Sequence, residues 1–142
     1  MKIVVINGPN LNLLGKREPD VYGTASFDDF YHSLVTQYPA VDFEYFQSNI
    51  EGELINELQR VGFTATGIIF NPGGYTHTSV AIGDTVAAIS TPVIEVHISN
   101  VHAREDFRKI SHVSSKVVGS IVGLGLQGYA LATEWFVSNA NK

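Results

Sequence analysis

A carboxylate and an imidazole separated by one residue give the sequence its sharpest chemical signal. Glu95 and His97 stand at the end of an apolar run that begins at Val93. If this run is a strand, residues two apart project from the same face, so the two side chains are neighbours. A carboxylate beside an imidazole fixes its tautomer and raises its pKa, which favours a charged general acid. The pattern fits a catalytic pair, and equally a hydrogen-bonded pair that caps the strand end.

Polar side chains also follow the other apolar runs. They are Asn7 and Asn10 after the first run, Gln47, Ser48 and Asn49 after the second, Asn71 and His77 after the third, and Ser99, Asn100 and His102 after the fourth. Because the carboxyl ends of parallel strands meet at one edge of a sheet, we expect these groups to converge where open α/β folds bind ligands. His77 could donate to a substrate hydroxyl or only cap the start of a helix.

Two arginines follow the fourth run. A short, charged helix is predicted over Ala103–Ile110, on which Arg104 and Arg108 share a face because they are four residues apart. One arginine could bind a substrate anion. The spacing alone favours the alternative of surface ion pairs with Glu105 or Asp106, and both interpretations stay open.

Other catalytic chemistries have weaker support. The chain has 5 histidines, but it lacks the H-E-x-x-H spacing, and no third metal ligand is evident beside Glu95 and His97. No G-x-S-x-G motif is present, and Ser79 is predicted to lie inside a helix, where its hydroxyl bonds to the backbone. The segment Gly123–Gly128 matches the G-x-G-x-x-G pattern, but no strand pattern follows it. We interpret this segment as a tight turn where the last helix packs on the sheet.

The elements that must position these groups alternate along the chain. Strands are predicted at Ile3–Ile6, Phe43–Phe46, Gly67–Phe70, Val93–Val96 and Val117–Val122. Helices are predicted from an N-cap at Ser26 to about Tyr38, over Glu51–Val61 with Gly62 as the C-cap, over Thr78–Ile89, over Ala103–Ile110 and over Gly128–Asn139. Runs rich in Val and Ile are typical of parallel strands buried on both faces. The alternation predicts an α/β fold, namely a flavodoxin-like, doubly wound, five-stranded parallel sheet in three α/β/α layers.

One connection is much longer than the others. The segment Asn7–Gly23 joins the first strand to the first helix, whereas an ordinary βα connection takes about 2–6 residues. It is rich in Asn, Gly and Pro, and it contains Arg17 and Tyr22. Long loops in compact domains are usually lids or binding loops, so we expect this one to contribute to the site.

Composition restricts the class of protein. With 142 residues, we expect a single domain over 1–142. A net charge of −5 argues against nucleic acid as the main partner. No apolar run approaches the roughly 20 residues that span a membrane. The absence of Cys excludes disulfides and thiolate metal sites and is compatible with a cytoplasmic location.

Several motifs together resemble the type II 3-dehydroquinate dehydratases, in order over nearly the whole chain. They are Asn7-Gly-Pro-Asn-Leu-Asn-Leu-Leu-Gly-Lys-Arg-Glu-Pro, Tyr22-Gly, Gln47-Ser-Asn, Asn71-Pro-Gly-Gly-Tyr-Thr-His-Thr-Ser, Glu95-Val-His-Ile-Ser-Asn, Arg104-Glu, Phe107-Arg108 and Gly123-Leu-Gly125 near Gly128-Tyr129. The resemblance implies a flavodoxin-like catalytic domain that dehydrates 3-dehydroquinate to 3-dehydroshikimate through an enolate, in the shikimate or quinate pathway. It also implies a dodecamer built from trimers, with no cofactor and no metal.

The resemblance also implies roles for particular residues. Tyr22 would be the base, kept ionised by Arg17 on a closing lid. His97, oriented by Glu95, would be the acid, and Asn10 would hold the water that stabilises the enolate. Residues that bind substrate would be Asn71, His77 and Arg108 at its hydroxyls, Ile98 and Ser99 at its carboxylate, and Asp84 from a neighbouring subunit, with Arg104 supporting the lid.

The sequence departs from the family pattern at two glycines. Gly83 stands where members commonly carry Arg or Leu, and Gly74 stands where Ala is usual. Gly83 adjoins Asp84, so the departure bears on the subunit contact. Two alternatives to this enzyme stay open: a flavodoxin-like binding module without turnover, and a cofactor-free lyase that acts on a related hydroxy-keto acid.

Overall fold

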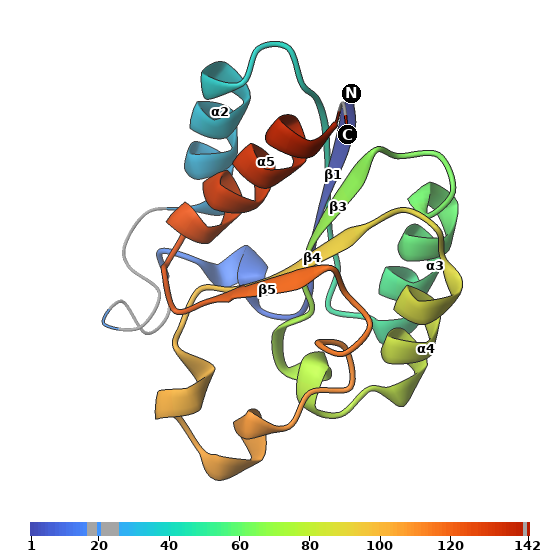
Figure 1. Ribbon diagram of the computed structural model, residues 1–142. Helices are drawn as coiled ribbons and strands as arrows, with labels where there is room; N and C mark the ends of the chain where they lie inside the picture. The colour runs from blue at the N-terminus through green and yellow to red at the C-terminus, as the bar shows by residue number, and fades with distance from the viewer. Residues whose placement is uncertain (17–19, 21–25, 141) are drawn as a thin grey trace.

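Five parallel strands form the central sheet of the described residues, which are 1–16, 20, 26–140 and 142 of a computed structural model (Figure 1). The strands are β1 (Lys2–Asn7), β2 (Asp42–Gln47), β3 (Gly67–Asn71), β4 (Val93–His97) and β5 (Gly119–Val122). They pair in the order β2-β1-β3-β4-β5. In this flavodoxin-like order the winding direction changes between β1 and β3, where such folds bind ligands. The predicted doubly wound sheet is confirmed.

The first four strands each end on a polar residue that the sequence prediction placed beyond the strand. These residues are Asn7, Gln47, Asn71 and His97. Asn7 pairs in register with both Gln47 and Asn71, so the ladder itself brings their side chains to one edge of the sheet. The fifth strand starts later than predicted, at Gly119 rather than Val117.

Helices cover both faces of the sheet. In Figure 1, α2 (Phe27–Gln37) and α5 (Gln127–Asn139) lie on one face, and α3 (Glu51–Val61) and α4 (Val80–Ala88) lie on the other. Alternate residues of β1 serve the two layers: Ile3 and Val5 belong to the core beneath α2 and α5, whereas Val4 and Ile6 belong to the core beneath α3 and α4. Burial on both faces explains the nearly continuous apolar runs.

The predicted helix over Ala103–Ile110 is wrong. The segment forms two short 3₁₀ helices, η3 (Val101–Ala103) and η4 (Asp106–Lys109). The backbone is extended at Arg104 and Glu105 between them, which prevents a continuous helix. The two arginines therefore do not share a helical face.

The third predicted helix starts later than expected. A 3₁₀ helix, η2 (Gly73–His77), follows β3, and α4 begins only at Val80. Ser79, which was expected inside the helix, is its N-cap, because its hydroxyl accepts a hydrogen bond from the Ile82 N–H at 3.0 Å. The Ser26 N-cap predicted for α2 is confirmed, with the Asp29 N–H donating to Ser26 Oγ at 3.1 Å.

The glycine-rich segment before α5 is a turn, as predicted. Gly123 has a φ of 88° and Gly125 a φ of 62°, which L side chains rarely adopt. A Cβ on Gly128 would lie 3.1 Å from Val96 Cγ1, so the glycine lets α5 approach the sheet closely. Within the described residues, no helix combines the length and the apolar character that crossing a membrane requires.

The two glycines that depart from the family pattern differ in their surroundings. A Cβ on Gly74 meets nothing within 4 Å, so alanine fits there. A Cβ on Gly83 would lie 2.3 Å from the carbonyl oxygen of His112. A larger residue at this position therefore needs a shift of the loop that contains His112.

Candidate active site

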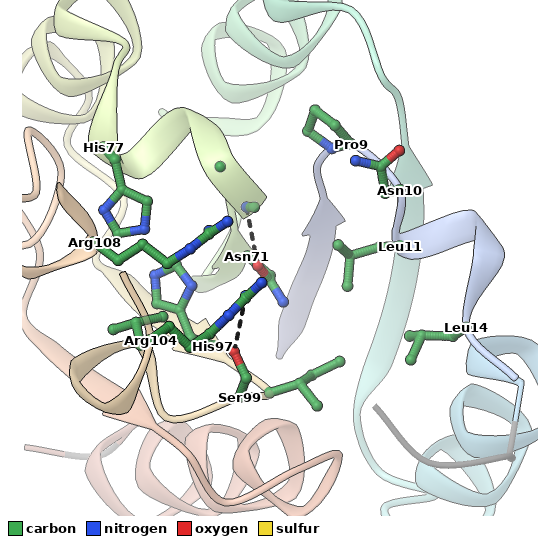
Figure 2. Close-up of a pocket in the computed structure, with 14 residues that line it drawn as sticks. Pro9, Asn10, Leu11, Leu14, Asn71, His77, His97, Ser99, Arg104 and Arg108 are labelled. Carbon is green, nitrogen blue, oxygen red and sulfur yellow. Dashed lines mark hydrogen bonds between the residues drawn. The ribbon is translucent and has the colours of Figure 1, made fainter. Parts of the chain in front are cut away.

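A cavity opens at the carboxyl ends of β1, β3 and β4, beside the switch point of the sheet (Figure 2). Its empty space, including the part open to solvent, is about 690 Å³. Its lining residues are Pro9, Asn10, Leu11, Leu14, Asn71, Gly73, Gly74, His77, His97, Ile98, Ser99, Val101, Arg104 and Arg108. The predicted convergence of polar side chains is confirmed for the ends of β1, β3 and β4, whereas Gln47, Ser48 and Asn49 at the end of β2 do not line this cavity.

His97 lines this cavity, and Glu95 lies behind it. The two side chains share one face of β4, and His97 Nε2 lies 2.7 Å from Glu95 Oε1. Glu95 is fully buried and His97 is 7% exposed. The pair predicted from the i, i+2 spacing therefore forms, with the imidazole at the cavity and the carboxylate away from it.

Hydroxyl groups surround the Glu95 carboxylate. Thr76 Oγ1 donates to its Oε1 at 2.5 Å, and Ser114 Oγ donates to its Oε2 at 2.5 Å. Ser120 Oγ lies 3.4 Å from Oε2. Burial raises the pKa of Glu95, but the hydrogen bonds from His97, Ser114 and Thr76 outweigh it, so the pKa lies below its usual value. Glu95 is therefore an ionised acceptor at neutral pH.

His77 lies beside His97 at the same cavity. Their ring centroids are 6.4 Å apart, and the His77 Nδ1 is 2.7 Å from the carbonyl oxygen of Ile110. Burial lowers the pKa of His77, and the nearby His97 and Arg108 lower it further, against the raising effect of the Ile110 carbonyl. Because a carbonyl only accepts, the neutral ring carries its hydrogen on Nδ1. Its Nε2 is then an acceptor, whereas the sequence had suggested a donor.

Arg104 and Arg108 both reach the cavity, although no common helix presents them (Figure 2). Arg104 Nη1 donates to Ser99 Oγ at 3.4 Å. Arg108 Nε donates to Glu105 Oε2 at 2.5 Å, so one of the expected surface ion pairs does form. The extended backbone between η3 and η4 brings both guanidinium groups to one cavity, which makes its wall cationic and suited to an anion.

The amide of Asn71 is held by groups that the sequence prediction missed. Its Nδ2 donates to the Tyr129 hydroxyl at 3.0 Å, and its Oδ1 accepts from the Gly73 N–H at 3.0 Å. The Tyr129 hydroxyl donates in turn to Asn7 Oδ1 at 2.8 Å. Both Asn7 and Tyr129 are fully buried. This chain, Asn71–Tyr129–Asn7, fixes the amide that lines the cavity.

Other residues missed from the sequence are apolar or distant in the chain. Leu11 and Leu14 are buried members of the core that also form one wall of the cavity. Their spacing of three within a polar loop was a usable signal. Thr76, Ser114 and Ser120 had no such signal, because only the tertiary fold brings them to Glu95.

The structure places Asp84 outside this cavity, and it does not describe two other predicted residues. Asp84 is exposed on α4 and does not line it. Arg17 and Tyr22 lie outside the described residues. Within the parts of the chain that the structure describes, no cluster of three or more His, Asp or Glu residues could hold a metal ion.

The fold and the site together define the class of protein: a flavodoxin-like α/β protein with a cationic cavity at the switch point of its sheet. Comparison with protein families refines this. The sequence model of the family described as Dehydroquinase class II matches residues 1–137, and the chain belongs to that family.

Relatives and solved structures agree with this assignment. The chain is 52% identical to a 3-dehydroquinate dehydratase of Fusobacterium nucleatum subsp. nucleatum, which it matches over 100% of both chains. It is 50% identical to a 3-dehydroquinate dehydratase of Bacillus licheniformis, with 99% of this chain and 98% of that one covered. A crystal structure of the type II dehydroquinase of Butyrivibrio crossotus has a TM-score of 0.92 and 45% identity, covering 96% of this chain and 97% of that one. The chain is thus an enzyme of the hydro-lyase class.

We expect removal of the Tyr129 hydroxyl to destabilise the fold. Tyr129→Phe keeps the ring in the core but leaves Asn7 Oδ1 without its donor and Asn71 Nδ2 without its acceptor. Leaving buried polar groups unpaired costs about 1–3 kcal/mol. Urea denaturation should therefore show a loss of this size in the free energy of unfolding.

Tyr38→Phe is the matched control, because among the described residues the Tyr38 hydroxyl bonds only to Glu134, at 3.3 Å near the surface. We expect it to change the free energy of unfolding by less than about 0.5 kcal/mol. Equal stability of the two variants would contradict a structural role for the Tyr129 hydroxyl.

Proposed function

We propose that this enzyme dehydrates 3-dehydroquinate to 3-dehydroshikimate. The observation that carries the proposal is the imidazole of His97, which faces a cationic cavity and is held from behind by the buried Glu95. An imidazole held by a carboxylate is suited to proton transfer. Membership of the dehydroquinase class II family supports this choice of substrate.

The residues that line the cavity support an assignment for each group of the substrate. We place its carboxylate at Ile98 and Ser99, whose hydroxyl already accepts a hydrogen bond from Arg104. Its hydroxyls lie against Asn71, His77 and Arg108. The hydrogen bonds that hold Asn71 and His77 keep these groups oriented before substrate binds.

The reaction proceeds in two steps in this proposal. Tyr22 removes the proton at C2, and the electrons of the C–H bond form an enolate whose oxygen is stabilised by a water held by Asn10. The enolate then reforms the carbonyl as a carbon–carbon double bond forms and the hydroxyl departs with a proton from His97. Water leaves, and the proton on Tyr22 returns to His97 before the next turnover.

The base needs help from a cation. A free tyrosine has a pKa near 10, so about one in a thousand is ionised at neutral pH. A cation within about 4–6 Å typically lowers such a pKa by about 1–3. Arg17, which lies in the same loop as Tyr22, supplies this charge in our proposal. Closure of the loop over the substrate would also exclude water and strengthen the interaction.

The assembly and the cellular role belong to the proposal as well. Asp84 is exposed on α4, away from the cavity of its own chain, which is compatible with a contact to a neighbouring subunit's site. We propose a dodecamer built from trimers, a single catalytic domain over 1–142, and a role in the shikimate or quinate pathway. The cytoplasmic location stays a prediction.

Incubation of the purified protein with 3-dehydroquinate tests the function. The product is a conjugated enone, so its ultraviolet absorbance should rise with time. The rate should be unchanged by a chelator, because the proposed steps use only side chains and water. A lack of turnover of 3-dehydroquinate, with turnover of another hydroxy-keto acid, would favour the related lyase. A lack of turnover with both would favour the binding module, and strong inhibition by the chelator would favour a metal site.

A further inference from the structure

Main-chain N–H groups determine which atom donates and which accepts in the hydrogen bonds behind Glu95. The N–H groups of Val113 and Ser114 lie 3.1 and 3.0 Å from Ser111 Oγ. Main-chain N–H groups only donate, and a serine hydroxyl has two lone pairs and one hydrogen. Both lone pairs of Ser111 Oγ are therefore occupied, and its own hydrogen must be donated elsewhere.

The donor and acceptor of the next two hydrogen bonds follow from this. Ser111 Oγ lies 2.6 Å from Thr76 Oγ1, so Ser111 donates and Thr76 accepts. The hydrogen of Thr76 then goes to Glu95 Oε1, at 2.5 Å. The His112 N–H donates to the Thr76 carbonyl at 2.8 Å, which holds the loop with Ser111 against η2. Thr76 itself is 1% exposed, so water does not compete for its hydroxyl.

These assignments determine which ring nitrogen of His97 donates a hydrogen bond to Glu95. Glu95 is ionised, and the hydrogen bond that its Oε1 accepts from Thr76 favours this state, so Oε1 carries no hydrogen toward the imidazole. Since His97 Nε2 lies 2.7 Å from this oxygen, Nε2 must be the donor. The remaining ring nitrogen, Nδ1, is then the one that exchanges a proton with a ligand in the cavity that His97 lines.

We propose that Ser111 and Thr76 are positioning residues, which commit His97 Nε2 to Glu95 and leave Nδ1 for proton transfer. The effect on turnover rests on the proposed function, in which His97 is the acid. The effect on the tautomer of His97 does not, because it follows from the hydrogen bonds alone. Neither residue needs to touch the reacting atoms.

The tautomer of His97 is the direct test. ¹⁵N NMR of the histidine-labelled protein distinguishes the ring nitrogen that carries a hydrogen from the one that does not, and comparison with His97→Ala assigns the signals. We expect the wild-type ring, when neutral, to carry hydrogen on Nε2. Thr76→Val removes the hydroxyl but keeps the shape, and Ser111→Ala weakens the same chain of hydrogen bonds, so in both variants the pKa of Glu95 should rise. A fraction of the molecules should then hold a hydrogen on Glu95 Oε1 and carry the ring hydrogen of His97 on Nδ1.

Neighbouring charges are kept constant in this comparison. The charged or titratable side chains that line the cavities around His97 and Glu95 are His77, His102, Arg104, Arg108 and Lys109. All of them are retained in both variants. Ser115→Ala is the matched control, because Ser115 lines the cavity behind Glu95 but bonds only to Lys116 among the described residues.

Turnover gives the second readout. We expect Thr76→Val to lower kcat about tenfold with little change in KM, since a hydrogen bond to a charged group is lost. Thr76→Ser, which restores the hydroxyl, should recover most of this rate, and Ser111→Ala should lie between Thr76→Val and wild type. The proposal is overturned if the tautomer stays on Nε2 in both Thr76→Val and Ser111→Ala, or if Ser111→Ala behaves like Ser115→Ala. If His97→Ala retains normal turnover, the proposed acid fails, and the NMR result still decides the role of the hydroxyls.

Discussion

His97→Ala is expected to lower kcat for 3-dehydroquinate about 10²–10⁴-fold, the usual contribution of a general acid. A hydroxide ion is a poor leaving group, so the enolate cannot expel it without a proton. His97 is the imidazole that lines the cavity and bonds to a buried carboxylate, which keeps it oriented toward the substrate. KM should change little if the hydroxyls are bound mainly by Asn71, His77 and Arg108.

Two comparisons separate this effect from a loss of structure. His32→Ala removes an exposed imidazole on α2 and should leave kcat unchanged. A substrate analogue that carries a better leaving group should recover turnover in His97→Ala, because its departure needs no proton. If His97→Ala retains a kcat within about threefold of wild type, or if the analogue gains nothing, His97 is not the acid.

The sheet and the pairing of Glu95 with His97 could be predicted, because residue patterns within short segments indicate both. Val93–Val96 is an apolar run, and the period of two along a strand places Glu95 and His97 on one face whatever the rest of the fold does. The convergence of Asn71 with His97 could be predicted for a similar reason, since parallel strands end at one edge. Alternation of strands and helices determines this topology.

The side chains that hold the site residues in place could not be predicted, because they are far from their partners in the sequence. Glu95 is bonded to Thr76 and Ser114, each 19 residues away, and Tyr129 is bonded to Asn7 across 122 residues. Serine and threonine are common in loops, so their type alone does not mark them. Only the packing of η2 and the loop at Ser111 against β4 gives them partners.

The error at Arg104 and Arg108 has a physical cause. Their spacing of four fits an α-helix, and the segment is charged enough to be an exposed one. Instead, Asn100 accepts from the His102 N–H at 3.2 Å and caps a single turn, after which the backbone extends at Arg104. That one of the arginines binds an anion stays a prediction, and both of them line the cavity by another route.

Tyr22→Phe is expected to reduce turnover by about 10³-fold or more, while 3-dehydroquinate still binds. Tyr22 lies outside the described residues, so this expectation rests on the family resemblance. A ketone acidifies the neighbouring C–H only through an enolate, and the enolate needs a base to form. The described cavity supplies cations, amides and imidazoles, but its lining contains no carboxylate that could act as this base.

Exchange of the C2 hydrogen with deuterated solvent distinguishes the two proposed roles. If the base acts first, His97→Ala should still exchange deuterium into recovered substrate, because the enolate forms and returns. Tyr22→Phe should not exchange, although calorimetry should show binding within about tenfold of wild type. Tyr38→Phe, which removes a tyrosine hydroxyl near the surface, is the control for both measurements. Exchange in Tyr22→Phe at the wild-type rate would assign the base elsewhere, and absence of exchange in His97→Ala would mean that proton removal and departure of the hydroxyl occur in one step.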